Sequence, residues 1–294
     1  LLSYKAGMRK PNPLIFIRAI QKTGVMPFQC VYFDDIPEFI FIAEAYWDLE
    51  WELQQIGFDF TYDKKLYDRL LHASPAEIRD HLRADLPYQD RSLRFIENHD
   101  EPRAVSAFGL EKSRAASVIT ATIPGLRFFH DGQMSGKQIH LSVHLRREPE
   151  EEANLSLGDF YEKLLSYSDG EALHTGTWQL LHTAPAWEGN GSHENILAWG
   201  WTNAREARVI AVNYSNARCE GRLWLPLDKL DKVPAVTLKD CFSGTVYERD
   251  TQEIREKGLY IKLKPWEAHG FEFDFEGQRL PKAGGRKYAK ERRS

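Results

Sequence analysis

Two short apolar segments that each end in an acidic residue constrain the fold of this chain most strongly. The first, residues 39–47, carries Glu44, and the second, residues 93–100, ends in Asn-His-Asp with Asp100 as its last residue. Short apolar runs bounded by polar residues are typical of buried parallel strands. Carboxylates just past such strands lie at the face of an α/β barrel where loops form active sites. The pattern therefore predicts that Glu44 and Asp100 lie together and could flank one bond.

The two segments, Phe-Ile-Ala-Glu-Ala-Tyr-Trp at 41–47 and Phe-Ile-Glu-Asn-His-Asp at 95–100, together resemble the α-amylase family of glycoside hydrolases. The similarity covers roughly residues 37–275. It implies that Glu44 is the general acid/base after the fifth barrel strand. It also implies that Asp100 is the third catalytic carboxylate, and that His99 binds the sugar and favours its distortion.

Three further residues beside these motifs are candidates for substrate binding. Trp47 could stack on a sugar ring, or it could pack with Trp51 at the helical spacing i, i+4. Asn98 belongs to the second motif. Arg103, in the loop after it, could hold a carboxylate through a bidentate hydrogen bond or could simply be solvated. We predict that Asn98, Trp47 and Arg103 surround the substrate together with His99.

The nucleophile of the family is missing from the sequence. In the family it is an Asp in a Gly-x-Arg-x-Asp motif at the end of the fourth strand, and no such motif occurs in these 294 residues. Asp35 is a poor replacement, because the eight residues between it and Glu44 leave no room for a helix and a strand. Since two cooperating carboxylates act as one unit, we expect no starch hydrolysis by this chain alone.

Apolar segments near residues 39–43, 58–63, 93–96 and 126–129 match the fifth to eighth strands of the family's barrel. A closed (β/α)8 (TIM) barrel has eight strands. The fold class predicted for residues 38–172 is therefore α/β, a partial barrel with strands 5–8 only. Its open sheet edges favour pairing with other chains, so we expect possible self-association.

Short strands with regular turn signals continue over residues 173–276 and predict an all-β sandwich. The resemblance places such a domain after the barrel. Trp187, Trp199 and Trp201 could form a carbohydrate platform, although packing in the core or at a domain interface is the interpretation that we favour. Residues 277–294 form a basic tail that we expect to be disordered.

Residues 1–37 have a different pattern. Lys10 opens a Lys-Pro-x-Pro segment before a helical pattern, and an apolar strand then ends at Asp34 and Asp35. This resembles the end of a haloacid-dehalogenase-like phosphatase, which implies that Lys10 steadies a phosphorylated Asp and that the paired acids hold Mg²⁺. The Asp-x-Asp nucleophile motif of those enzymes is absent, so a solvated acidic turn is the alternative. A gene fusion, an assembly error or a truncated reading frame near residues 35–39 would explain the change of pattern.

Composition excludes several other classes of protein. Hydrophobic residues make up 42% and charged residues 28% of the chain, as in soluble globular proteins. No apolar run approaches the roughly 18 residues of a membrane span. The net charge of −4 does not favour nucleic-acid binding. Three widely spaced cysteines match no zinc motif and indicate a reducing compartment, so we expect a cytoplasmic protein. No cofactor is expected, although the resemblance allows Ca²⁺.

The sequence thus predicts a retaining glycoside hydrolase of α-amylase type whose partner is an α-glucan or oligosaccharide. Glu44 would protonate the leaving oxygen and then activate water, and a buried setting would raise its pKa for that task. The alternatives are a non-catalytic carbohydrate-binding protein and a fragment that has no function of its own.

Overall fold

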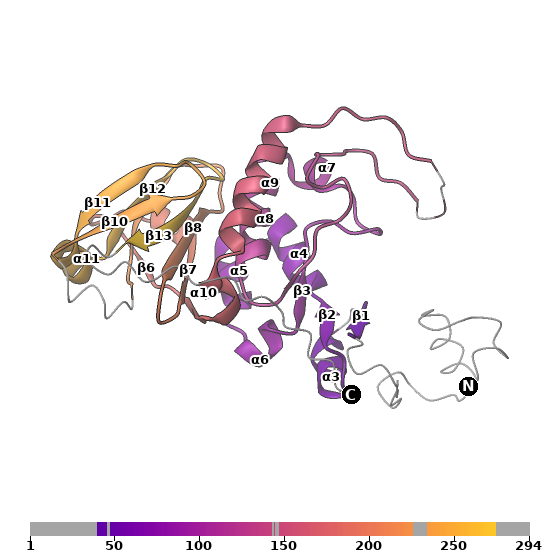
Figure 1. Cartoon of the computed structure of the whole chain (residues 1–294), viewed down its shortest axis with the longest axis horizontal. Helices are drawn as coiled ribbons and strands as arrows, with labels where there is room; N and C mark the ends of the chain where they lie inside the picture. Colours follow the sequence, from indigo (N-terminus) through magenta and orange to yellow (C-terminus); the bar gives the residue numbers. More distant parts are fainter. Residues whose placement is uncertain (1–39, 46–47, 143, 145–146, 226–233, 275–294) are drawn as a thin grey trace, which may run out of the picture.

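The computed structural model of the chain describes residues 40–45, 48–142, 144, 147–225 and 234–274. The predictions for Lys10, Asp34, Asp35 and Trp47, and for the basic tail, lie outside these residues. The described elements form two groups, which are a parallel sheet with its helices and a pair of antiparallel sheets (Figure 1). The mixed α/β composition agrees with the sequence prediction.

The parallel sheet has four strands in the order β1-β2-β3-β4. They are β1 (Ile42–Ala43), β2 (Phe60–Tyr62), β3 (Ser92–Arg94) and β4 (Leu126–Arg127). Every neighbouring pair is parallel, and the register places Tyr62 beside Leu93 and Leu93 beside Leu126. Partners in register share a face, so these apolar side chains line one side of the sheet. Within the described residues, β1 and β4 are the two edges.

The helices around this sheet are α3 (Glu50–Gln55), α4 (Lys64–His72), α5 (Pro75–His81), α6 (Leu86–Gln89), α7 (Ala104–Phe108), α8 (Leu110–Thr122), α9 (Leu155–Ser168) and α10 (Glu171–Thr175). Helices α3 to α8 connect consecutive strands on the opposite face of this sheet, and α9 and α10 follow β4. Ser74 and Glu77 form a capping box around Pro75 and so begin α5. None of the helices in the described residues has the length and apolar character of a membrane span.

The second group, residues 177–274, is called the β-domain below. One sheet has the order β11-β10-β13-β8-β7-β5 and the other the order β12-β9-β6. The strands are β5 (Thr177–Leu180), β6 (Thr183–Ala184), β7 (Ile196–Thr202), β8 (Ala207–Asn213), β9 (Cys219–Leu223), β10 (Ala235–Asp240), β11 (Val246–Asp250), β12 (Leu259–Leu263) and β13 (Ala268–Asp274). A 3-10 helix, η2 (Ser192–Asn195), precedes β7, and α11 (Thr251–Lys257) joins β11 to β12. The two sheets share one apolar cluster.

β13 is a central strand, although its local sequence pattern is weak. It begins just after Trp266 and pairs with β10 on one side and β8 on the other. Its alternation of polar and apolar residues is short, and the strands on either side of it are far away in the sequence. Pairing with those strands therefore determines that this segment is a strand, more than its local propensity does.

Side chains of the β-domain contact the helices of the parallel sheet. The indole N–H groups of Trp199 and Trp201 donate to the Thr122 carbonyl at 3.1 and 2.6 Å. The Tyr214 hydroxyl donates to the Leu70 carbonyl at 2.6 Å. Trp199 and Trp201 are buried and so pack at this interface, which agrees with the interpretation that we favoured for them. Trp187, in contrast, is exposed.

Candidate functional site

The structure brings together three of the residues that the sequence singles out. Glu44, His99 and Asp100, called the cleft trio below, have ligand atoms that all lie within 4.8 Å of one another. His99 Nε2 lies 3.7 Å from Glu44 Oε1 and 3.5 Å from Asp100 Oδ1. Glu44 follows β1 directly and Asp100 follows β3, so both lie at the carboxyl ends of parallel strands. The predicted proximity of the two carboxylates is observed.

Tyr62, the last residue of β2, lies between these two strands and was not predicted as a site residue. Burial raises the pKa of its hydroxyl, and the nearby negative charges of Glu44 and Asp100 raise it further. Its ring also contacts Phe95 and Phe128, with centroids 5.4 and 6.1 Å away. Its position at the end of the middle strand was the available signal in the sequence. Tyr62 thus adds a neutral hydroxyl and an aromatic face beside the trio.

The cleft trio is open to solvent. The side chain of Glu44 is 36% exposed and that of Asp100 is 62% exposed. The buried setting that we expected for Glu44 is therefore wrong for this structure. The physical reason is its position on the edge strand β1, which has a single neighbour, β2, in the described sheet. Nothing from a further strand covers this side of Glu44 within the described residues.

Asn98 shapes the turn that carries His99 and Asp100. Its side chain is completely buried, and its Oδ1 accepts hydrogen bonds from the backbone N–H groups of Asp100 at 2.9 Å and Glu101 at 2.8 Å. Its Nδ2 has no partner among the described residues. The structure therefore gives Asn98 a role in holding the turn, whereas the sequence prediction placed it on the substrate.

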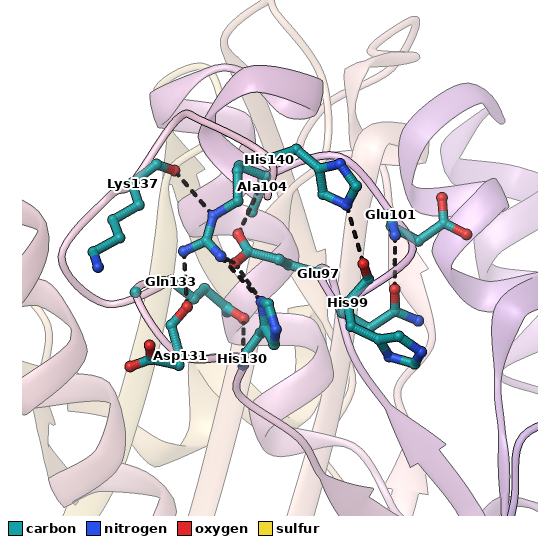
Figure 2. A network of polar contacts seen from close by, with 12 residues as sticks. Glu97, His99, Glu101, Ala104, His130, Asp131, Gln133, Lys137 and His140 are labelled. Atoms are coloured by element: carbon teal, nitrogen blue, oxygen red, sulfur yellow. Dashed lines mark hydrogen bonds and ion pairs between the residues drawn. The ribbon is translucent and has the colours of Figure 1, made fainter. Parts of the chain in front are cut away.

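A buried ion pair lies directly behind this turn, as Figure 2 shows. Glu97 Oε1 lies 3.0 Å from Arg103 Nη1 and 3.1 Å from His130 Nδ1, and its Oε2 accepts from the Ala104 N–H at 2.6 Å. Arg103 also donates to the Asp131 carbonyl at 2.8 Å. Arg103 is thus not solvated and does hold a carboxylate, but that carboxylate belongs to Glu97.

This network ties two loops together. Burial raises the pKa of Glu97 against the opposing effects of the Ala104 N–H and of the charges on Arg103 and His130. Gly132 has φ +82°, and a Cβ there would lie 2.3 Å from the Arg103 guanidinium, so the close approach requires glycine. The loop after β4 therefore fixes the loop after β3, which carries the cleft trio's His99 and Asp100.

A second charged group lies on the helix-facing side of the same sheet. Asp63, His81 and Arg94, called the buried trio below, are all buried. The Asp63 carboxylate forms an ion pair with Arg94 and a 2.9 Å contact with His81 Nε2. Its Oδ1 caps α4 by accepting from the Leu66 N–H at 3.0 Å. Although burial alone would raise the pKa of Asp63, the charges of Arg94 and His81 hold it well below its usual range.

The cleft trio also has ligands that suit a divalent cation, since two carboxylates and one imidazole lie within 4.8 Å. All three side chains are partly or fully exposed, and such clusters are common without an ion. The other pair of acids that the sequence suggested for a metal, Asp34 and Asp35, lies outside the described residues. Whether the chain holds a metal stays a prediction.

No protein-family model matches this chain, and no curated protein matches its sequence. Solved structures do match. A maltogenic α-amylase of Thermotoga neapolitana aligns with a TM-score of 0.62 and 20% identity, over 91% of this chain and 60% of that one. The α-amylase of Geobacillus thermoleovorans, solved with acarbose, has a TM-score of 0.60 and 17% identity, over 82% and 54%. A debranching enzyme of Nostoc punctiforme has a TM-score of 0.56 and 17% identity, over 80% of this chain and 51% of that one.

These matches show an α-amylase-like fold for the described chain. At 17–20% identity they show the fold alone. The chain spans between about half and 60% of the length of these three proteins. Nothing in the comparisons shows the haloacid-dehalogenase resemblance of residues 1–37.

Proposed function

We propose that this chain carries the acid/base half of an α-amylase-type glycosidase centre that acts on α-glucans or oligosaccharides with retention. The observation that supports it best is the convergence of Glu44, His99 and Asp100 at the carboxyl ends of strands in a sheet with an α-amylase-like fold. In this proposal β1–β4 are strands 5–8 of a (β/α)8 barrel, and the β-domain is the sandwich that follows it.

The chemistry assigned to each side chain follows from its atoms. Glu44 would donate a proton to the glycosidic oxygen and afterwards take one from the attacking water. Asp100 and His99 would accept and donate hydrogen bonds to the hydroxyls of the distorted sugar. Tyr62 would pack its ring against that sugar. The proposal invokes no cofactor, no nucleic acid and no membrane.

Retention also needs a nucleophilic carboxylate about 5–5.5 Å from the acid/base. Asp100 takes the role of the third carboxylate in this proposal, and the sequence contains no Gly-x-Arg-x-Asp motif for the nucleophile. The chain alone is therefore expected to bind glucan without cleaving it. The nucleophile would have to come from residues outside this sequence.

The test is an assay of reducing sugar released from maltoheptaose and soluble starch by the purified chain. We expect no release above the level of a Glu44→Gln variant. Release by the wild type that is lost in Glu44→Gln would overturn the assignment of an incomplete centre. A long DNA read across codons 35–39 would then show whether an upstream barrel half with the nucleophile belongs to the same gene.

A non-catalytic carbohydrate-binding protein is the second candidate, and the exposure of the cleft trio favours it. Affinity electrophoresis in starch-containing gels tests glucan binding, which both candidate functions predict and a fragment without activity does not. Retardation of the chain without release of sugar would support glucan binding. A smaller retardation of the Asp100→Asn variant would place that binding at the trio. Migration unchanged by starch would contradict both candidate functions and favour a fragment without activity.

The open sheet edges lead to a proposal about assembly. Ile40 and Ile42, on the β1 edge, are both exposed, and large apolar side chains at a sheet edge that is unpaired within the described residues favour pairing between chains. We expect a concentration-dependent oligomer by size-exclusion chromatography with light scattering. A Ile42→Lys variant should shift the distribution toward monomer, and a sharp monomer peak for the wild type would contradict the proposal.

A further inference from the structure

A groove of about 460 Å³ opens in the β-domain, far from the cleft trio. It lies between β11 and β12, which are edge strands of the two different antiparallel sheets. The two strands are joined through α11 but do not pair with each other, so the side of the β-domain stays open between them. Figure 1 shows these strands on the side of the β-domain that faces away from β1–β4.

The lining of this groove combines aromatic faces with positive charge. Tyr247, Tyr260 and Phe271 are the aromatic residues of the lining, and Tyr247 packs against the apolar cluster between the sheets. The cationic side chains are Arg218, Arg249, Lys262 and Lys264, whereas Glu267 is the single acidic residue of the lining. Such a volume lies within the range of small-ligand sites and fits a group of about one or two sugar rings.

The two arginines are the cations with the fewest competing acids. Lys262 lies 3.3 Å from a Glu220 oxygen, and Lys264 lies 3.9 Å from a Glu267 oxygen. Arg249 stacks on Tyr247, with its guanidinium carbon 5.0 Å from the ring centroid, and donates to the Glu248 carbonyl at 2.9 Å. In the described part of the chain, neither Arg249 nor Arg218 forms an ion pair with a carboxylate.

A buried histidine forms part of the floor. His269 lines the groove although its exposed fraction is only 9%. Its Nδ1 lies 2.9 Å from Asp240 Oδ2, and Asp240 is itself fully buried and accepts from the Gly270 N–H at 3.1 Å. Asp240 therefore orients the ring with Nδ1–H inward. Nε2 has no hydrogen-bond partner among the described residues, and it is the polar atom that remains for a ligand.

We propose that this groove binds a phosphorylated sugar. The aromatic ring of Tyr247 would contact the apolar face of the sugar, and Arg218 and Arg249 would bind the phosphate. His269 Nε2 would form a hydrogen bond with a sugar hydroxyl. A neutral glucan would leave the excess of positive charge without a partner. This site is separate from the cleft trio and involves no bond making or breaking, so it stands even if the proposed glycosidase chemistry fails.

Isothermal titration calorimetry of the full chain with glucose 6-phosphate tests the proposal, with maltose and inorganic phosphate as comparison ligands. We expect glucose 6-phosphate to bind more tightly than either of the others. The double variant Arg218→Gln/Arg249→Gln should weaken it by at least about tenfold, because each charge-assisted contact is strong. The wild-type affinity should also fall as salt is raised.

Two further variants keep the result interpretable. Arg205→Gln changes an exposed arginine in the β7–β8 turn, outside the groove, and should leave the affinity for glucose 6-phosphate unchanged. His269→Gln should weaken the binding of glucose 6-phosphate but leave the binding of inorganic phosphate unaffected. Thermal melts of each variant check that it folds.

Several outcomes would overturn the proposal. Equal or tighter binding of maltose would mean a neutral-sugar site, and equal binding of inorganic phosphate would mean an anion site that does not recognise the sugar. Binding that is unchanged in a folded Arg218→Gln/Arg249→Gln variant would place the ligand elsewhere. No binding of glucose 6-phosphate up to about 10 mM would exclude the site.

Discussion

The cleft trio and the buried trio combine histidine with charged partners on the same four-stranded sheet, but they differ in every contact. In the cleft trio the imidazole lies 3.5–3.7 Å from its carboxylates, and the side chains reach solvent. In the buried trio the imidazole lies 2.9 Å from its carboxylate, and the side chains are almost fully covered. Both trios combine a histidine with a carboxylate, but the buried trio adds the guanidinium of Arg94 and is covered from solvent.

This difference shows how burial divides stability from function. A buried charge loses its hydration and must be compensated by a partner in fixed geometry, so removing that partner is costly. An exposed charge keeps its water, and a ligand can replace that water at little cost. The buried trio is therefore expected to stabilise the fold, and the cleft trio is expected to contact a ligand. Four predictions test this division.

The largest effect is expected for Asp63→Asn. It leaves Arg94 buried without a carboxylate, while Asn keeps an oxygen for the α4 cap, so the charge is the main change. We expect the free energy of unfolding to fall by about 3–5 kcal/mol. Urea unfolding followed by circular dichroism measures it. The matched control is Asp68→Asn on the exposed face of α4, which should cost less than about 0.5 kcal/mol. Equal losses in the two variants would contradict the division.

The second prediction concerns pH. Because the pKa of Asp63 is lowered in the folded protein, the unfolded chain binds more protons in acid than the folded chain does. The stabilisation from Asp63 is complete above its unfolded pKa of about 3.9 and is lost as pH falls below that value. Urea unfolding between about pH 6 and pH 3 should show the difference between wild type and Asp63→Asn shrinking as pH falls. A constant difference would mean that this carboxylate does not titrate in that window.

A smaller effect is expected for Glu97→Ala, because Arg103 would keep the Asp131 carbonyl as an acceptor. The buried Ala104 N–H would lose its partner, and we expect a loss of about 2–3 kcal/mol. The loop that carries the cleft trio would also loosen, so retardation in starch gels should weaken. Glu97→Gln keeps the shape of the side chain. Its free energy of unfolding and its retardation in starch gels should therefore both fall less than those of Glu97→Ala. An equal loss in the two variants would show that the charge matters more than the hydrogen-bond geometry.

The smallest effect on stability is expected for Glu44→Gln. Its side chain is exposed on an edge strand, so the free energy of unfolding should change by less than about 0.5 kcal/mol. Urea unfolding tests this directly. A loss as large as that of Asp63→Asn would show that Glu44 stabilises the fold, and the comparison between the two trios would then be wrong.

The parts of the structure that local sequence decides were predicted well. The parallel strands lie where the apolar runs lie. Glu44 and Asp100 were predicted to meet because both follow parallel strands. Glu97 and His130 were missed, since they are 33 residues apart and no local pattern links them. Local signals act within a few residues, whereas this pair depends on how two loops pack.

The sequence by itself therefore determined that Glu44 and Asp100 could act together, because both follow parallel strands, and the family resemblance added His99. Only the tertiary structure decided how exposed they are, that Arg103 holds Glu97, and that Asp240 orients His269 at a groove. Burial and pairing of charges depend on contacts between distant segments. Hydration and its loss, which set the role of each ionisable side chain, exist only once those segments have come together.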